Sequence, residues 1–159
     1  ALVERLHGRP PAAWTRHAWT RIERFGAGGR DMPLEAVAGK KVVVATALAR
    51  PEAFVADAQA RGARIVGDLR FRDHHPFSPA DVDRIAELAR TKDAAVLCSG
   101  KDWVKLSRLL PQPRGVEWLV AWAGIEFLAG EAEVRRAVLA AVGGAVSSEK
   151  MSSAGARIA

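Results

Sequence analysis

The sequence predicts an α/β protein: a three-layer α/β/α sandwich around a mostly parallel sheet of about four strands, preceded by an irregular linker segment. Apolar, β-branched runs alternate with amphipathic helical patterns through residues 41–142, which is the arrangement that builds a parallel sheet with crossover helices. The helices also open on recognisable start signals, such as Ser78-Pro79-Ala80-Asp81. We expect the α/β domain to occupy residues 39–143.

The first 38 residues show no long hydrophobic period, and we expect them to form a connector. Pro10-Pro11 and Gly26-Ala27-Gly28-Gly29 interrupt the segment, and residues 12–25 are compatible with either a short helix or a strand. The scattered apolar side chains need a surface supplied from elsewhere, which favours a link from residues 1–38 to a neighbouring lobe. These side chains are Leu2, Leu6, Trp14, Trp19, Ile22 and Phe25.

The domain itself begins with a strand. Val42 to Leu48 is a continuous apolar run, typical of a strand that is buried on both faces. A helix is expected to begin at Pro51 and to end before Gly62, because proline favours the first helical position and glycine the C′ position. Ser78 is the expected N-cap of the next helix. The remaining elements are expected as a helical turn at 35–38, strands at 64–71, 94–98 and 116–122, a short helix after residue 99, a helix at 131–142 and a flexible tail at 144–159.

Composition restricts the possible classes of protein. The chain has 159 residues, of which 49% are hydrophobic and 26% charged, so it can bury a core of its own. The sequence contains no apolar run long enough to span a bilayer. The single cysteine, Cys98, excludes an intrachain disulfide, and we interpret it as a small core residue.

The net charge of +6 favours anionic partners, such as phosphates or an acidic membrane surface. An arginine-rich surface with no such partner explains the charge equally well. Nucleic acid is not expected as a partner, because tyrosine is absent, aromatic residues are few and no docking element is recognisable.

Reactive side chains follow two of the predicted strands, the second and the third in chain order. Asp73, His74 and His75 follow the second strand, and Lys101 and Asp102 follow the third. The carboxyl ends of parallel strands lie at one edge of a sheet, so we expect an acid, an imidazole and an amine to meet there. This set suits phosphate chemistry: lysine neutralises phosphate charge, histidine moves a proton and aspartate orients the imidazole.

A simpler interpretation treats the same residues as turn chemistry, with Asp73 capping a turn and both histidines solvated. A metal site is disfavoured, because zinc requires three or four ligands and adjacent side chains in an extended loop diverge. We therefore assign no metal ligand.

Four segments, in one order and with matching gaps, resemble the C-terminal half of the tetraacyldisaccharide 4′-kinase family, the lipid A kinases of Gram-negative bacteria. The segments are Gly39-Lys-Lys-Val-Val-Val44, Ala49-Arg-Pro-Glu-Ala-Phe54, Phe71-Arg-Asp-His-His-Pro-Phe77 and Lys101-Asp-Trp-Val-Lys-Leu106. The resemblance covers roughly residues 20–142. It implies two α/β/α lobes joined by a two-stranded linker, and transfer of the γ-phosphate of ATP, with Mg²⁺, to the 4′-position of a tetraacyldisaccharide 1-phosphate.

The resemblance also implies roles for individual residues. His74 matches the histidine of the family's catalytic Asp–His dyad, with Asp73 as its neighbour, and Arg50, Lys101 and Asp102 fall at positions expected to bind substrate or phosphate. The dyad aspartate, the phosphate loop and the magnesium ligands belong to the family's N-terminal lobe. We therefore expect that lobe and a lipid A disaccharide precursor as partners, and a peripheral location on the cytoplasmic face of the inner membrane. We also expect residues 1–159 alone to be inactive and to hold neither ATP nor Mg²⁺.

Three departures from the family pattern stand out. Arg72 replaces a proline, Ser99-Gly100 replace Thr-Glu, and Leu48-Ala49 replace Gly-Ile. The alternative function is a stand-alone, non-catalytic α/β binding or assembly module, which these departures would permit.

Overall fold

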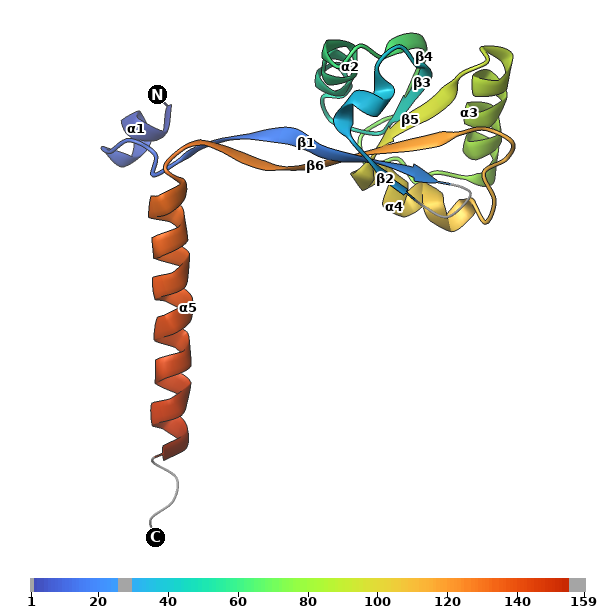
Figure 1. Cartoon of the computed structure of the whole chain (residues 1–159). Helices are drawn as coiled ribbons and strands as arrows, with labels where there is room; N and C mark the ends of the chain where they lie inside the picture. The colour runs from blue at the N-terminus through green and yellow to red at the C-terminus, as the bar shows by residue number, and fades with distance from the viewer. Residues whose placement is uncertain (1, 26–29, 155–159) are drawn as a thin grey trace. The chain divides into compact units, whose positions relative to one another are not determined.

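A computed structural model describes residues 2–25 and 30–154 (Figure 1). The expected glycine turn at 26–29 and the last five residues of the expected tail lie outside the described residues. The elements are α1 (Leu2–His7), β1 (Trp14–Phe25), β2 (Arg30–Met32), the 3₁₀ turn η1 (Leu34–Val37), β3 (Lys41–Thr46), α2 (Pro51–Ala60), β4 (Arg64–Arg70), α3 (Pro79–Thr91), β5 (Ala95–Ser99), α4 (Gly100–Leu106), η2 (Ser107–Leu109), β6 (Trp118–Ala129) and α5 (Glu131–Ala154).

The sheet is mixed and mostly parallel, which confirms the predicted α/β class. Its strand order is β2-β1-β6-β5-β3-β4. The pairs β3–β4, β3–β5 and β5–β6 are parallel, whereas β1 and β2 pair antiparallel. The four strands expected from the sequence are β3, β4, β5 and β6.

The sheet has six strands, not about four, and the segment expected to be an irregular linker contains two of them, β1 and β2. Residues 14–25 form the twelve-residue strand β1, which lies between β2 and β6 in the sheet. Its buried residues are Trp19 and Ile22, three positions apart, so burial along β1 does not follow the period of two that marks a strand in a sequence. Two further boundaries also differ: β6 continues to Ala129 and α5 continues to Ala154, beyond the expected ends at residues 122 and 142.

Helices cover both faces of the sheet. On one face, Val43, Val96 and Cys98 share a buried cluster with residues of α3 and α4. On the other face, Val42, Val44 and Leu97 pack with Phe54 and Ala58 of α2. Figure 1 shows α2 and α3 on opposite sides of the strands. Successive residues of β3 therefore face different cores, which explains why its sequence is a continuous apolar run.

The predicted helix boundaries are confirmed for α2 and α3. Pro51 begins α2, and Gly62 follows its end with φ +81°, a left-handed conformation that glycine adopts without strain. At α3, Ser78 Oγ accepts the backbone N–H of Asp81, and the Asp81 carboxylate accepts the backbone N–H of Ser78 at 2.8 Å. This reciprocal capping box fixes the point at which the chain leaves the preceding loop.

The chain divides into two compact units. One comprises residues 18–124, and it contains both helix layers and the candidate site. The other comprises residues 1–17 together with 125–159. Within this second unit, the outer half of β1 is joined to the outer half of β6 by a two-pronged hydrogen bond between Arg16 and Glu126, at 2.8 and 3.1 Å.

Candidate functional site

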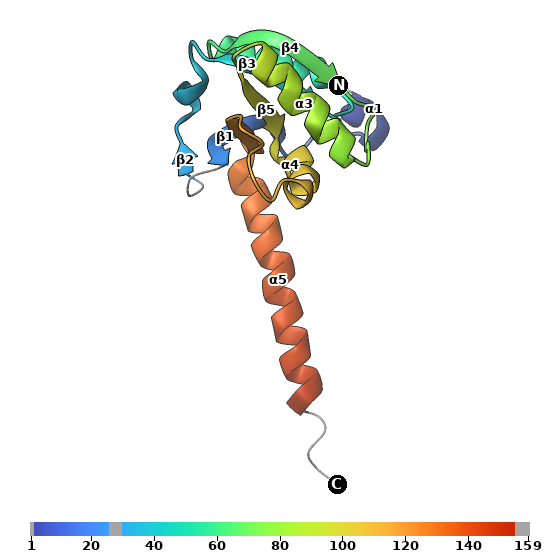
Figure 2. The same cartoon turned by 90° about the vertical axis from the view of Figure 1, so that its right-hand side faces the viewer.

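Two loops meet at the carboxyl edge of the parallel strands. The histidine loop, residues 71–77, follows β4, and α4 follows β5 directly. Lys101 Nζ at the start of α4 lies 3.7 Å from Asp73 Oδ1 in the histidine loop. Figure 2 shows α3 and α4 on the same side of the sheet. The expected meeting of the two loops is therefore observed for Asp73 and Lys101.

Asp73 lies between Lys101 and His74. Its Oδ1 accepts the backbone N–H of His74 at 3.0 Å, and its Oδ2 lies 3.6 Å from His74 Nε2. The three charged or titratable groups thus form a line of amine, carboxylate and imidazole. The His74 side chain is 75% exposed and that of Lys101 is 51% exposed, so both ends of the line are open to a ligand.

The backbone of His74 is left-handed, with φ +60°. This conformation is uncommon outside glycine and costs on the order of 1–3 kcal/mol, so it persists only where the surroundings impose it. Such strain is concentrated at functional sites. The side chains of the adjacent His74 and His75 also lie in different environments: that of His74 is exposed and that of His75 is mostly buried.

His75 is mostly buried, with its side chain 23% exposed. Its Nε2 lies 3.0 Å from Asp81 Oδ2, and its ring stacks on Phe71 at 4.8 Å and meets Phe77 edge-on at 5.3 Å. The expectation of two solvated histidines is thus wrong for His75. Asp73 does cap a turn, as the simpler interpretation held.

The environment of Asp81 favours its charged form. Burial acts to raise the pKa of Asp81, but hydrogen bonds from His75 and Ser78 outweigh it and hold the pKa below the usual value. Asp81 therefore holds both the helix cap and the His75 ring as a carboxylate.

Asp102 is fully buried, unlike Lys101 beside it. Its Oδ2 accepts the hydroxyl of Ser99 at 2.7 Å and the backbone N–H of Ala47 at 3.2 Å, which ties the end of β5 to the chain leaving β3. Among the described residues, no hydrogen-bond partner reaches Asp102 Oδ1 or the hydroxyl of Thr46. With no exposed surface, Asp102 is placed to hold the loops rather than to touch a ligand.

Cys98 lies beneath this point and is completely buried. Burial, reinforced by the negative charge of Asp102, raises the pKa of the Cys98 thiol well above its ordinary value. The thiol is therefore a core group, as predicted.

Arg50 lies at the same edge, as the N-cap residue of α2 after β3. Its side chain is exposed and forms no hydrogen bond or ion pair within the described part of the chain. The structure therefore does not join Arg50 to the Lys101–Asp73–His74 line.

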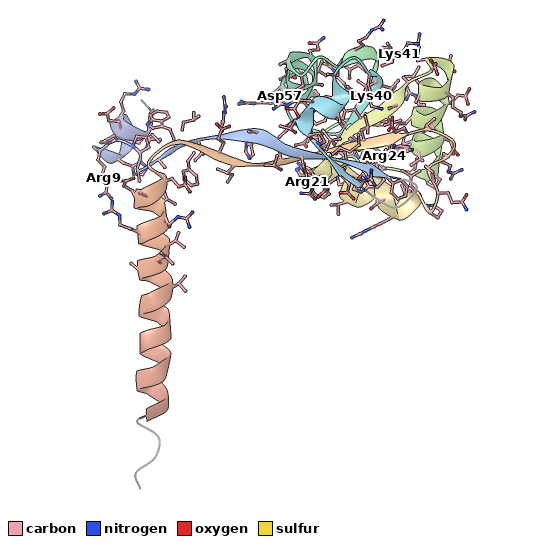
Figure 3. The ribbon with its side chains drawn as sticks, viewed as in Figure 1. Arg9, Arg21, Arg24, Lys40, Lys41 and Asp57 are labelled. Carbon is pink, nitrogen blue, oxygen red and sulfur yellow. The ribbon has the colours of Figure 1, made fainter. Side chains whose placement is uncertain are left out.

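The packing of Trp122 explains why a glycine stands at position 100, which the sequence alone did not show. A Cβ on Gly100 would lie 2.5 Å from Cε3 of Trp122. The Trp122 ring is fixed in turn, because its Nε1 donates to Glu23 at 2.7 Å and the Arg21 guanidinium lies over it at 4.8 Å. Arg21 is labelled on β1 in Figure 3.

Much of the basic charge is already paired with acids. Arg24 and Lys40, also labelled in Figure 3, both face Glu117, at 3.8 and 2.8 Å. Lys41 pairs with Asp93 at 3.2 Å. A pocket of about 570 Å³ lies among Lys40, Lys41 and Glu117, at the amino ends of the strands and so at the edge opposite the histidine loop. None of the residues of the histidine loop, and neither Lys101 nor Asp102, lines this pocket.

Comparison with known proteins identifies the family. The model of the family described as Tetraacyldisaccharide-1-P 4′-kinase matches residues 7–143. The chain belongs to this family. The match extends the resemblance inferred from the sequence, which covered roughly residues 20–142.

Individual relatives agree. The chain is 40% identical over 80 residues to a tetraacyldisaccharide 4′-kinase of Halothermothrix orenii, a match that covers 50% of this chain and 21% of the relative. It is 35% identical over 141 residues to one of Anaeromyxobacter dehalogenans, covering 88% of this chain and 36% of the relative. The chain thus spans about a fifth to a third of the length of the curated relatives that it matches. No solved structure matches.

Two further observations limit what the described residues can do. They contain no group of three or more His, Cys, Asp or Glu side chains that could hold a metal ion. No helix within them is long and apolar enough to cross a membrane.

Proposed function

We propose that this chain supplies the histidine-bearing portion of a tetraacyldisaccharide 4′-kinase. The observation that carries the proposal is the line Lys101–Asp73–His74, in a chain that belongs to that family. Phosphoryl transfer asks a protein mainly to position groups and to stabilise charge. A carboxylate with a lysine amine 3.7 Å away on one side and an exposed imidazole 3.6 Å away on the other is suited to that task.

Each residue of the line has a distinct role in this proposal. His74 accepts the proton of the attacking sugar hydroxyl, because an imidazole can take up a proton near neutral pH. Asp73 holds the His74 backbone and ring through the contacts at 3.0 and 3.6 Å. Lys101 attracts a substrate phosphate, and Arg50 at the same edge adds a second positive charge. Asp102 contributes by fixing the loops from beneath.

ATP and Mg²⁺ do not fit the described residues by themselves. No three-ligand group is present among them, and the Asp73 carboxylate is already engaged by His74 and Lys101. The sequence contains no GxxxxGK[ST] phosphate loop. We assign nucleotide and metal binding to an N-terminal lobe of the whole kinase.

Exposed apolar side chains support a partner of this kind. In the unit made of residues 1–17 and 125–159, large hydrophobic residues are exposed on α1, β1, β6 and α5: Val3, Leu6, Trp14, Ile125, Leu128, Val138, Leu139 and Val142. Large exposed apolar side chains are compatible with a surface that binds other parts of a protein or a membrane. We propose that these exposed side chains contact the rest of the kinase. The whole kinase then acts on a lipid A disaccharide precursor at the cytoplasmic face of the inner membrane.

The test is the substitution His74→Ala in the full-length kinase. We expect kcat to fall by about 100-fold or more, the usual loss when a general acid/base is removed. His17→Ala is the matched control, because His17 is an exposed histidine on β1 outside the site, and it should leave kcat unchanged. An unchanged rate in His74→Ala would remove His74 from this role.

A second measurement concerns the chain alone. We expect residues 1–159 to show neither tight ATP binding nor phosphoryl transfer. ATP-dependent phosphorylation of the disaccharide by this chain alone would contradict the division of labour proposed here.

A further inference from the structure

The left-handed backbone conformation of His74 is unfavourable by itself, so contacts with neighbouring residues must stabilise it. The residue on its N-terminal side, Asp73, accepts the His74 backbone N–H at 3.0 Å. Asp73 is itself an exposed side chain, and its other contacts are the His74 ring at 3.6 Å and the Lys101 amine at 3.7 Å. Water can compete for all of these contacts, because the side chains of Asp73, His74 and Lys101 are all exposed. The firm attachment lies on the C-terminal side of His74.

His75 is that attachment. Three different parts of the residue are held at once: the ring edge by Asp81 at 3.0 Å, the ring face by Phe71 at 4.8 Å, and the backbone carbonyl by Lys105 Nζ at 3.3 Å. Its backbone N–H also donates to the carbonyl of Arg72 at 3.0 Å, which closes a turn around Asp73 and His74.

The anchors of His75 belong to rigid elements. Asp81 lies in the capping box at the start of α3, and Lys105 lies in α4, the helix that also carries Lys101. His75 is therefore attached to α3 through its ring and to α4 through its backbone carbonyl, and these two attachments together set the distance between the histidine loop and α4. The separation of 3.7 Å between Lys101 and Asp73 depends on that setting.

We propose that His75 is a positioning residue of the kinase site: its buried ring holds His74 in the left-handed conformation that presents the His74 imidazole beside Asp73 and Lys101. The two adjacent histidines then have opposite tasks. His74 faces the substrate, and His75 faces the protein. This inference rests on the proposed function of His74.

The experiment compares His75→Ala and His75→Phe with His74→Ala in the full-length kinase. His75→Ala removes the bond to Asp81 and the stacking on Phe71, and we expect kcat to fall by about 10-fold or more while KM for the disaccharide stays within about twofold. His75→Phe keeps an aromatic ring against Phe71, so it should fold even if the alanine variant does not. It should lie between the wild type and His75→Ala in kcat.

A structural readout on residues 1–159 separates positioning from mere stability. A residue with positive φ has a short distance between its own HN and Hα and gives a strong NOE between them. We expect this NOE for His74 in the wild-type chain and its weakening in His75→Phe, at a temperature where both variants are folded. A lowered melting temperature with an unchanged His74 NOE and an unchanged kcat would mean that His75 only adds stability, and it would overturn the inference.

The outcomes distinguish this inference from the proposed function. If His74→Ala leaves kcat unchanged, the proposed function fails and the inference fails with it. If His74→Ala lowers kcat about 100-fold but both His75 variants keep wild-type kcat, only the positioning role is refuted.

Discussion

Replacing Gly100 with alanine should destabilise the protein, although alanine is the better helix former. Gly100 is the first residue of α4, where alanine would bring a gain of up to about 1 kcal/mol. The added Cβ, however, would lie 2.5 Å from Cε3 of Trp122 and 2.9 Å from both Cδ2 and Cζ3. Carbon atoms in ordinary contact are about 3.5–4.0 Å apart, so either α4 or the indole ring must move by about 1 Å.

The ring has little freedom to move. Trp122 donates a hydrogen bond to Glu23 at 2.7 Å, lies under the Arg21 guanidinium and packs against the core face shared by Trp103. Overpacking of this kind costs about 1–3 kcal/mol, which exceeds the gain in helix propensity. We therefore expect Gly100→Ala to lower the free energy of unfolding by about 1–2 kcal/mol, measured from the urea midpoint by tryptophan fluorescence.

Two comparisons test whether Trp122 imposes the glycine. In a Trp122→Leu background the obstruction is smaller, so Gly100→Ala should cost much less than in the wild type. Gly143→Ala is the matched control, because, apart from its chain neighbours and the adjacent backbone of α5, no atom of the described residues lies within 4 Å of the Cβ that it adds, and it should not destabilise the chain. A Gly100→Ala variant as stable as the wild type, or equal costs in the two backgrounds, would show that Trp122 does not impose the glycine.

Two further predictions concern buried groups. Cys98 should react with a soluble disulfide reagent only after unfolding in urea, because the thiol is fully buried and its pKa is raised; rapid labelling of the native chain would contradict this. Asp81→Asn should lower the free energy of unfolding by about 1 kcal/mol at pH 7, because Asp81 is the N3 residue of the capping box and its carboxylate accepts the backbone N–H of Ser78. Because the folded pKa of Asp81 is lowered, its stabilisation is present above the unfolded pKa of about 3.9 and is lost as the pH falls through the folded pKa. The difference between Asp81→Asn and the wild type in urea unfolding should therefore shrink below about pH 4, and a constant difference would argue against a charge-dependent cap.

The sequence predicted best where one local rule decided the structure. The strand β3 is apolar on both faces, α2 begins with a proline and ends before a glycine with positive φ, and α3 carries a complete capping box. None of these signals depends on a distant residue. The sheet from β3 to β5 was therefore predictable from neighbouring positions alone.

The sequence left residues 12–25 open between a helix and the strand β1, because the burial of β1 is supplied by distant partners. Only Trp19 and Ile22 of its twelve residues are buried, and its neighbours in the sheet are β2 and the C-terminal strand β6. The end of β6 was underestimated for a related reason, since burial stops at Ala121 while the strand continues to Ala129. Apolar patterns report burial, and these strand halves are regular without being buried.

The candidate site was predictable in part for the same physical reason. Parallel strands bring their carboxyl ends to one edge, so the meeting of Asp73 with Lys101 followed from the order of elements. The burial of Asp102 did not follow, because Lys101 and Asp102 are adjacent and only the helix geometry of α4 turns one outward and the other inward. The side chain of His74 is exposed and that of His75 is mostly buried. This difference depends on the positive φ of His74, which nothing in the surrounding sequence indicates.

The edge of the sheet therefore contains two kinds of polar residue that look alike in a sequence. Asp73, His74 and Lys101 keep part of their side chains in water and remain able to exchange partners. His75 is mostly withdrawn from water and Asp102 completely so. The His75 ring is bonded to Asp81, and Asp102 Oδ2 accepts hydrogen bonds from Ser99 and the backbone of Ala47. Such hydrogen bonds between buried groups make their surroundings rigid, and a rigid frame keeps an exposed imidazole within a fraction of an ångström of where it must act. Substitutions of His75 or Asp102 should therefore change the fraction of molecules in which Asp73, His74 and Lys101 are correctly arranged. Substitutions of Asp73, His74 or Lys101 should instead change the chemistry of the correctly arranged site.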